Sequence, residues 1–225
     1  MWAVLPAKDF RNAKERLSPA LSPAERQDLF AAMLEDVLAA AADAPSLAGI
    51  LVLTRDAKAA EIAGRYGARV EDEPANDGQS AAVTRGAQHL IEAGIDSILT
   101  LPGDTPNLRA SEIETIIARH DSQPAMSIVP SHDERGSNCI ALSPPDLIPF
   151  HFGHDSLAPH LDEAAKRNIE PLIHHDLPGL ALDIDTPADL ALLLESDADT
   201  RARAYLEASG IAERFAAEAN RPGAA

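Results

Sequence analysis

Apolar positions along the first two-thirds of the chain follow two different periods. Short, continuous apolar runs such as 2–6 and 49–54 predict buried strands, whereas apolar residues spaced three or four apart predict amphipathic helices. The clearest helix begins after Ser22, because Ser22 and Glu25 match the capping-box pattern and Pro23 occupies the first helical position. The alternation of the two periods predicts an α/β fold with a largely parallel sheet and helices on both faces.

The remaining elements follow from the same patterns and their flanking turn residues. Ser111 and Glu114 match a second capping box, which predicts a helix start at Ser111. After residue 195 the chain is rich in alanine and charge, so we expect one main domain over 1–195 and a helical appendage over 196–225 that packs on a neighbouring subunit in a homodimer. Predicted strands lie at 2–6, 49–54, 68–71, 97–101, 125–130, 139–143, 171–175 and 180–183. Predicted helices lie at 22–42, 56–66, 81–93, 111–120, 157–167 and from 187 onward, and a polar loop is expected at 73–80.

The composition is that of a soluble globular protein of 225 residues, with 45% hydrophobic and 24% charged residues. No apolar run approaches the ~18 residues of a membrane helix, and the first residues do not have the pattern of a signal peptide. Cys139 is the single cysteine, which excludes an internal disulfide and a multi-thiolate zinc site. These features predict a reduced, cytoplasmic location and no membrane association.

Charge is distributed unevenly along the chain. The net charge of −17 disfavours binding to nucleic acid and to anionic membranes, because both require a basic surface. Residues 8–16 nevertheless hold four cations against two anions, a local charge of +2. This cationic segment indicates either an anion site, such as one for nucleotide phosphates, or an ordinary solvated loop. Its charged residues are Lys8, Arg11, Lys14 and Arg16 with Asp9 and Glu15.

Carboxylates gather in two places that follow predicted strands. Asp104 lies in a Pro-Gly-Asp-Thr-Pro segment, where a metal-binding or catalytic role competes with that of an ordinary turn residue. Asp183 and Asp185 are two apart at a predicted strand end, so both are expected on one side, where like charges require a cation. Such oxygen ligands suit Mg²⁺. Thr186 and Asp189 are explained more simply as the N-cap and N3 positions of the next helix.

Three polar segments are expected at the same edge of the sheet. The cationic segment 8–16 follows the first strand, Gly78-Gln79-Ser80 follows the third, and Asp104 follows the fourth. Ligands of parallel α/β sheets bind at the carboxyl ends of the strands. The positions of these segments therefore favour a ligand site for the cationic segment over a solvated loop.

Five motifs in order, from residue 2 to about residue 195, resemble the CofC/FbiD guanylyltransferase family. That family makes the activated side-chain precursor of the deazaflavin coenzyme F-420. The third and fourth motifs narrow the choice, because the last one also occurs in molybdopterin nucleotidyltransferases and related sugar transferases. Serine stands at 137 where the family pattern is expected to have threonine, which keeps the hydroxyl. The motifs are Pro6–Lys8 with Ala13–Ser18, Leu101–Pro106, Gly136–Asn138, Phe152–His160 and Pro178–Leu190.

The resemblance implies a fold, a reaction and partners. The fold is a GT-A-like, Rossmann-like nucleotidyltransferase fold over 1–195, with a mixed, mostly parallel seven-stranded sheet flanked by helices. The reaction is transfer of GMP from GTP to the phosphate of phosphoenolpyruvate, 3-phosphoglycerate or 2-phospholactate, with pyrophosphate leaving. The implied partners are GTP, the small phospho-acid and a downstream transferase that acts on the deazaflavin precursor.

The resemblance also implies roles for individual residues. A catalytic group contains Lys14, Asp104, Asp183 and Asp185, and its three aspartates would hold Mg²⁺. No nucleophilic serine or cysteine is needed, and the histidines receive no metal-binding role. The nucleotide-binding group is Lys8, Lys14, Arg16, Gly78, Gln79 and Ser80, and the acceptor-binding group is Ser137, Gly153 and Ser156.

Two other functions remain open at this point. One is a transferase of the same fold that acts on another nucleotide or on a sugar, such as a molybdopterin nucleotidyltransferase. Those enzymes usually have a glycine-rich loop after the first strand, whereas this chain has no glycine before Gly49. The other is a nucleotide-binding protein without catalytic activity, against which the three carboxylates argue.

Overall fold

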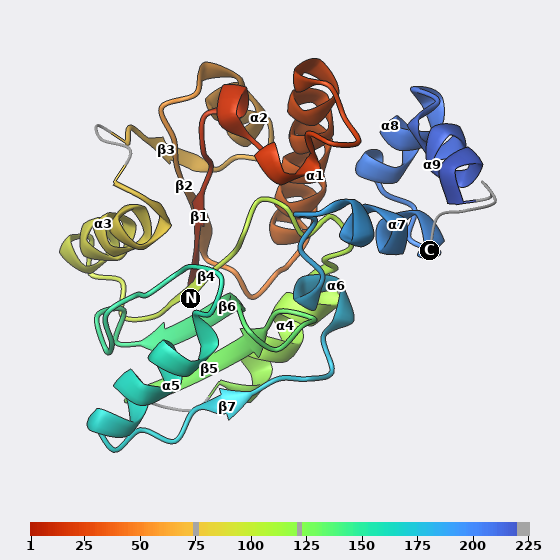
Figure 1. The fold of residues 1–225 in the computed structure, drawn as a ribbon. Coiled ribbons are helices and arrows are strands. Elements are labelled where there is room, and N and C mark those ends of the chain that lie inside the picture. Colours follow the sequence, from red (N-terminus) through yellow and green to blue (C-terminus); the bar gives the residue numbers. More distant parts are fainter. Residues whose placement is uncertain (74–76, 121–122, 220–225) are drawn as a thin grey trace.

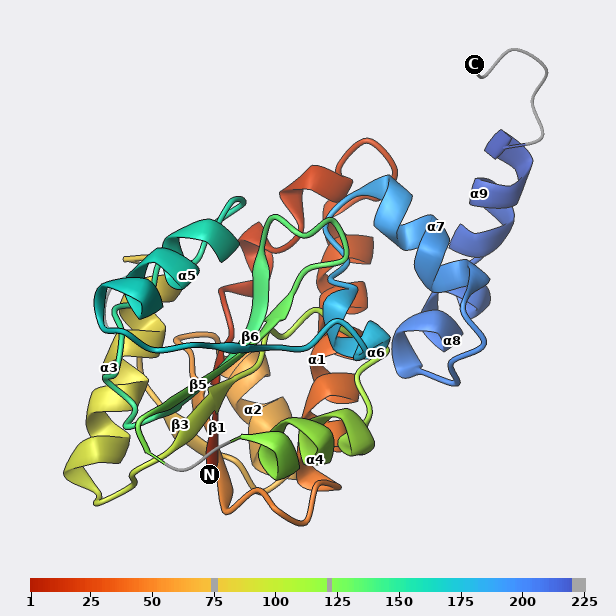
Figure 2. The same ribbon diagram turned by 90° about the horizontal axis from the view of Figure 1, so that it is seen from below.

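The computed structural model describes residues 1–73, 77–120 and 123–219. A central sheet is covered on one face by α1, α2 and α4 and on the other by α3 and α5, as Figures 1 and 2 show from two directions. The strands are β1 (Trp2–Pro6), β2 (Gly49–Leu53), β3 (Arg69–Glu71), β4 (Ile98–Thr100), β5 (Ala125–Pro130), β6 (Ser137–Ser143) and β7 (Leu172–Ile173). The helices are α1 (Pro23–Ala42), α2 (Ala57–Arg65), α3 (Gln79–Glu92), α4 (Ala110–Arg119), α5 (Leu157–Lys166), α6 (Pro178–Ala181), α7 (Pro187–Glu195), α8 (Arg201–Ala208) and α9 (Ile211–Ala219).

The sheet has seven strands in the order β3-β2-β1-β4-β6-β5-β7. β1 lies parallel to both β2 and β4, so the chain builds the sheet first toward one edge and then toward the other. β6 runs antiparallel to both of its neighbours, β4 and β5. The prediction of a mixed, mostly parallel seven-stranded sheet is confirmed. The reversal beside β1 creates the topological switch point at which α/β sheets bind ligands.

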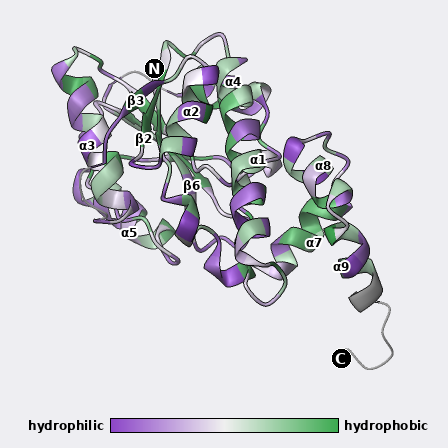
Figure 3. Cartoon of the chain, turned by 90° about the horizontal axis from the view of Figure 1, so that it is seen from above, coloured by the Kyte–Doolittle hydropathy of each residue, from purple (hydrophilic) through white to green (hydrophobic). Residues whose placement is uncertain are grey.

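Side chains of β1 alternate between two apolar cores. Ala3 and Leu5 pack with α1, α2 and α4, whereas Val4 packs with α3 and α5 on the opposite face. The alternation is the two-residue period of a strand that is buried on both sides. Figure 3 shows hydrophobic strands in the interior and hydrophilic residues along the outward faces of the helices.

The predicted capping box of α1 is present. The Ser22 hydroxyl accepts a hydrogen bond from the Glu25 N–H, and the Glu25 carboxylate accepts one from the Ser22 N–H at 2.8 Å. Pro23 occupies the first helical position, where a missing N–H costs nothing. The predicted buried face includes Leu34 and Leu38, both fully buried.

The helix predicted at 111–120 is present as α4, but its predicted cap is wrong. α4 begins at Ala110 with Arg109 as its N-cap, because the buried Glu112 accepts a hydrogen bond from the Arg109 N–H at 3.3 Å. The strand expected at 180–183 is largely replaced by α6 (Pro178–Ala181). Glu112 is again the reason, because its carboxylate accepts the N–H of Gly179 at 2.8 Å and holds the first turn of α6. Gly179 passes so close to the backbone of α4's entry loop that a Cβ there would clash.

The segment expected as an appendage contains α8 and α9. Helix α8 packs on α1 of the same chain. The α1 side chain Asp36 accepts hydrogen bonds from the N–H groups of Arg201 and Ala202, both at 2.9 Å. The described residues contain no helix that is long and apolar enough to cross a membrane.

Candidate active site

A cavity of about 620 Å³ opens at the carboxyl ends of the parallel strands, at the switch point. Pro6 of β1, Asp104 after β4 and Ser137 at the start of the antiparallel β6 all contribute to its wall. Ser80 does not line it; its hydroxyl accepts the Phe152 N–H at 2.8 Å and ties α3 to the loop before α5. Residues 74–76, in the loop expected near guanine, lie outside the described residues. The predicted site residues that line the cavity are Lys8, Lys14, Arg16, Gly78, Gln79, Asp104, Ser137, Gly153, Ser156, Asp183 and Asp185.

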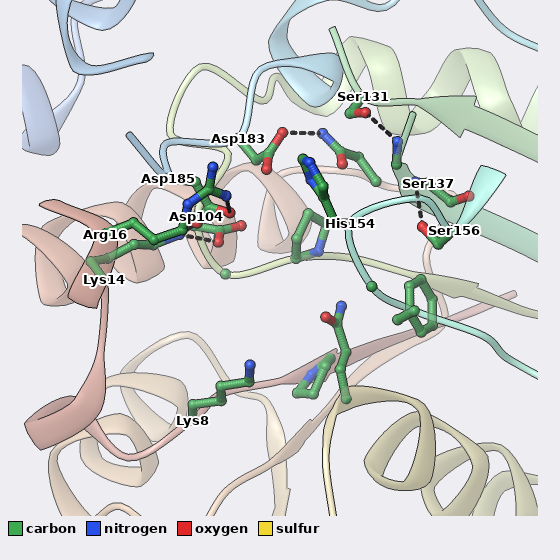
Figure 4. Close-up of a pocket in the computed structure, with 18 of the residues that line it drawn as sticks. Lys8, Lys14, Arg16, Asp104, Ser131, Ser137, His154, Ser156, Asp183 and Asp185 are labelled. Carbon is green, nitrogen blue, oxygen red and sulfur yellow. Dashed lines mark hydrogen bonds and ion pairs between the residues drawn. The ribbon is translucent and has the colours of Figure 1, made fainter. Parts of the chain in front are cut away.

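Lys14 joins two of the predicted carboxylates. Its backbone adopts a left-handed conformation with φ of 55°, and its side chain is only 5% exposed. The Nζ donates to Asp104 and, at 2.8 Å, to Asp185, as the dashed lines in Figure 4 show. Burial alone would lower the pKa of Lys14, but the two carboxylates raise it to about 12. Lys14 is therefore a fixed ammonium ion that offsets part of the negative charge of this site.

Asp183 is held from the other side of the cavity. Its carboxylate accepts a hydrogen bond from the Asn138 amide at 3.1 Å (Figure 4). Burial, and then the nearby charge of Asp104, raises the pKa of Asp183. The neighbouring Ile184 N–H donates to the Asp104 carbonyl at 3.0 Å, which fixes the two acidic segments against each other. The structure thus brings together carboxylates that are about 80 residues apart in sequence.

Asp183 and Asp185 do not lie on a strand, as the sequence suggested, but in the connection between α6 and α7. Helix α7 begins with the predicted capping box, in which the Thr186 hydroxyl accepts the N–H of Asp189. The Asp189 carboxylate accepts the N–H groups of Thr186 at 2.7 Å and of Asp185 at 3.1 Å. The cap therefore also fixes the backbone of Asp185. Burial would raise the pKa of Asp185, but the charge and hydrogen bond of Lys14, together with the charges of Arg16 and Lys8, lower it.

A buried hydroxyl pair lines the opposite part of the cavity. The Ser137 N–H donates to the Ser156 hydroxyl at 2.9 Å, and the Ser137 hydroxyl lies 3.0 Å from Nδ1 of His160. The His151 N–H donates to Nε2 of His160 at 2.8 Å, so Nε2 carries no proton and Nδ1 is the donor to Ser137. Each hydroxyl already accepts one hydrogen bond and retains its own proton to donate. Burial, reinforced by the charge of His151, lowers the pKa of His160 to about 4.

Mg²⁺ is the ion that the carboxylates imply, and the residues fit it in chemistry. Within the described residues, no three His, Cys, Asp or Glu side chains are already arranged as a metal-ligand group. The Lys14 ammonium lies between two of the three carboxylates, and its position explains why the three are not grouped around a common point. The Oδ1 atom of Asp104 is buried without a hydrogen-bond partner in the described structure, as expected of an oxygen that binds a cation. Hard carboxylate oxygens are the ligands that Mg²⁺ prefers.

Sequence reasoning missed several residues that shape the site. Asn138 was expected only as part of the Gly136–Asn138 motif, although its side chain donates a hydrogen bond to Asp183. His160 received no role, although it fixes the Ser137 hydroxyl. The sequence pattern gives no role to Glu73, although it is buried and lines the cavity. Cys139 is buried, does not line the cavity and has a pKa raised by that burial, which agrees with a reaction that needs no thiol.

The strand order, the switch-point cavity, its lysines and its three carboxylates together define an enzyme of the nucleotidyltransferase class. More specifically, the chain belongs to the family of guanylyl transferase CofC-like proteins, whose family model matches residues 1–221. The match includes α8 and α9 as well as the sheet domain.

Named relatives agree with this membership. A phosphoenolpyruvate guanylyltransferase of Conexibacter woesei is 38% identical over 201 residues, which cover 89% of this chain and 90% of the relative. A 3-phospho-D-glycerate guanylyltransferase of Colwellia psychrerythraea is 35% identical over 190 residues, covering 84% of this chain and 89% of the relative. The two relatives thus carry names with different acceptor acids.

Solved structures support the fold. A protein of Desulfovibrio desulfuricans G20 assigned as a nucleotide-diphospho-sugar transferase matches with a TM-score of 0.73, 17% identity and coverage of 95% of this chain and 97% of the other. A nucleotidyl transferase from Methanothermobacter matches with a TM-score of 0.66, 19% identity and coverage of 92% and 98%.

Proposed function

We propose that the protein transfers GMP from GTP to the phosphate of a three-carbon phospho-acid and releases pyrophosphate. The observation that carries the proposal is that a cationic segment, three carboxylates and a buried hydroxyl pair all line one cavity. The names of the two relatives support phosphoenolpyruvate or 3-phosphoglycerate as acceptor, and 2-phospholactate is the third candidate. The product is the activated precursor used for the side chain of coenzyme F-420.

The reaction is a displacement at the α-phosphorus of GTP. An oxygen of the acceptor phosphate forms a bond to that phosphorus, the bond to the β-phosphate oxygen breaks, and pyrophosphate leaves with the bonding electrons. The acceptor phosphate is already ionised at pH 7, so no general base is required. Because two anions must approach each other, the enzyme mainly has to position them and offset their charge.

Residues of this chain supply the positive charge around the triphosphate. Lys8, Lys14 and Arg16 come from the loop after β1 and line the cavity. Arg16 lies 3.4 Å from Asp185, beside Lys14 (Figure 4). We assign all three cations to the phosphates of GTP, with Lys14 nearest to the carboxylates. Asp104, Asp183 and Asp185 would hold Mg²⁺, which offsets phosphate charge when bound.

The acceptor acid is assigned to the buried hydroxyl pair. Ser137 and Ser156 each retain a hydroxyl proton that can be donated to a carboxylate or phosphate oxygen, and Gly153 lines the cavity next to them. These donors lie apart from Lys14 and Arg16 in Figure 4, with Asp183 between the two groups. The separation supports two neighbouring substrate positions.

Thermal unfolding with GTP, CTP, ATP and UTP, each with and without Mg²⁺, tests the nucleotide assignment. GTP should raise the melting temperature in the presence of Mg²⁺ and much less in its absence, because a ligand that binds only the folded state stabilises it. Equal shifts with all four nucleotides, or a shift with CTP alone, would contradict a GTP-dependent enzyme.

A further inference from the structure

Glu73 is a buried carboxylate in the cavity wall that the proposed reaction does not use. It follows β3 and is only 6% exposed. It lines the same cavity as Lys8, Gly78 and Gln79. Across the part of the chain that the structure describes, no hydrogen bond or ion pair to its side chain is found. The nearby cations Arg85 and Lys8 influence the Glu73 carboxylate through their charge, without a direct contact.

The Glu73 side chain is largely buried, but its oxygens are not among the fully buried atoms that lack a partner, so they face the open cavity. A carboxylate that faces a cavity without a protein donor can accept hydrogen bonds from a molecule bound there. Burial raises the pKa of Glu73, whereas Arg85 and then Lys8 act in the opposite direction. The two cations offset part of the effect of burial, and the described structure supplies no hydrogen-bond donor to the Glu73 oxygens. The missing donors are expected to come from the molecule that fills the cavity.

The position of Glu73 identifies which part of that molecule it faces. β1, β2 and β3 form one half of the sheet, and Glu73, Lys8 and Gly78 follow strands of this half. In doubly wound folds each such half binds a mononucleotide beyond its strand ends. Ser137 and Ser156, assigned to the acceptor, come instead from β6 and the start of α5. Glu73 therefore lies on the nucleotide side of the cavity.

Base chemistry limits what a carboxylate can bind there. Guanine presents two adjacent donors on its Watson–Crick edge, N1–H and the N2 amino group, and a carboxylate can accept from both. Adenine and cytosine present a ring-nitrogen acceptor at the corresponding position, which a carboxylate repels. Uracil presents one N–H between two carbonyl oxygens. We propose that Glu73 binds the N1–H and N2 amino group of guanine and gives this enzyme its selectivity for GTP, an inference that rests on the proposed function.

Steady-state kinetics with GTP and inosine triphosphate test this contact, because inosine lacks only the N2 amino group. The wild-type enzyme should prefer GTP by about tenfold or more in kcat/KM, since a buried acceptor left unpaired rejects the analogue. Glu73→Gln should lower kcat/KM for GTP by about tenfold or more and lower kcat/KM for inosine triphosphate less. The ratio of the two kcat/KM values should therefore decrease, and Glu73→Ala should decrease it further.

Asp72→Asn is the matched control, because Asp72 is the exposed neighbour of Glu73 and does not line the cavity. This variant loses the same charge and should keep the preference for GTP. A preference in Glu73→Gln and Glu73→Ala equal to that of the wild type would overturn the assignment of Glu73 while leaving the guanylyltransferase intact. A wild-type enzyme that neither binds nor turns over GTP would instead overturn the proposed function itself.

Discussion

At the scale of single residues, the site depends on Lys14 as much as on the three aspartates. Asp104 and Asp185 lie close together and would repel each other if the Lys14 ammonium did not lie between them. Removing one partner from a buried ion pair leaves an uncompensated charge, which costs more than the pair itself contributes. The same ammonium lines the cavity assigned to GTP, so one side chain serves both the structure and the proposed reaction.

Asp104→Asn and Asp183→Asn should each abolish turnover while the protein remains folded. Both side chains line the cavity, and loss of one carboxylate from a magnesium site should lower kcat by roughly two decades or more. Pyrophosphate release measured over a range of Mg²⁺ concentrations checks this, with the exposed turn residue Asp146→Asn as control. Activity within about threefold of wild type in either variant would refute the metal assignment.

Lys14→Ala and Ser156→Ala should affect different substrates. Lys14→Ala should raise the KM for GTP or lower kcat, because its charge is needed as pyrophosphate leaves. Ser156→Ala should mainly raise the KM for the acid by about 1–2 kcal/mol, one hydrogen bond to a charged group. Kinetics with each substrate varied at saturation of the other separate the two effects. The reverse pattern would show that the two substrates have been assigned to the wrong ends of the cavity.

His160 should make the stability of the protein depend on pH between about 6.5 and 4. Its pKa is about 4 in the folded state and near 6.5 when unfolded, so the unfolded state binds more protons in this range. The stabilisation is complete above pH 6.5 and is lost as the pH falls, on the order of 3 kcal/mol in all.

Urea unfolding at several pH values measures this dependence. His160→Gln should flatten the slope between pH 6.5 and 4, whereas His175→Gln, at an exposed position, should leave it unchanged. An unaltered slope in His160→Gln would mean that the imidazole is not held neutral by the fold.

At the scale of elements, α8 is attached to the sheet domain through its N-terminus. Thr200 is the local N-cap, and its hydroxyl accepts the Arg203 N–H at 3.2 Å. Asp36 of α1 accepts the first two helical N–H groups, so the orphan donors of α8 are satisfied from two different elements. Ala202 and Leu206 are fully buried in the core that contains α1. This part of the chain is therefore built into the core and does not line the cavity.

Asp36→Ala should destabilise the protein by about 1–3 kcal/mol, because buried N–H groups lose their acceptor. The KM for GTP should stay unchanged, because neither Asp36 nor α8 lines the cavity. Asp28→Ala is the matched control on α1, since the exposed pair of Asp28 with Lys58 should contribute little. Amide exchange would report the effect as faster exchange across α8. Unchanged exchange and stability would contradict the capping role.

At the scale of the whole molecule, the fold was predictable where the local sequence decides the structure. The spacing of apolar residues and the Ser22 cap predicted α1, and the alternation of strands and helices predicted the parallel part of the sheet. The strand expected at 180–183 does not form. A residue distant in sequence, Glu112, accepts a hydrogen bond from the Gly179 N–H and stabilises the first turn of α6 instead. Propensity alone contains no information about such a contact.

The candidate site was predictable in part for a similar reason. Residues in ordered motifs, such as Asp104 and Ser137, could be expected to meet at one edge of the sheet. Glu73 and His160 could not, because their importance comes from burial and from hydrogen bonds between separate elements. A glutamate after a short strand and a histidine in a helix indicate no function by themselves, because the sequence does not show which residues surround them.

The most direct measurement of the central claim is mass spectrometry of the reaction products. The full-length protein would be incubated with GTP, Mg²⁺ and, in turn, phosphoenolpyruvate, 3-phosphoglycerate and 2-phospholactate, together with the downstream transferase and the deazaflavin acceptor that trap a labile product. We predict pyrophosphate and a trapped side-chain product that form only when GTP, Mg²⁺ and one of the acids are all present. Absence of product with every acid, or equal product formation when CTP or ATP replaces GTP, would contradict the assignment of this chain as a guanylyltransferase.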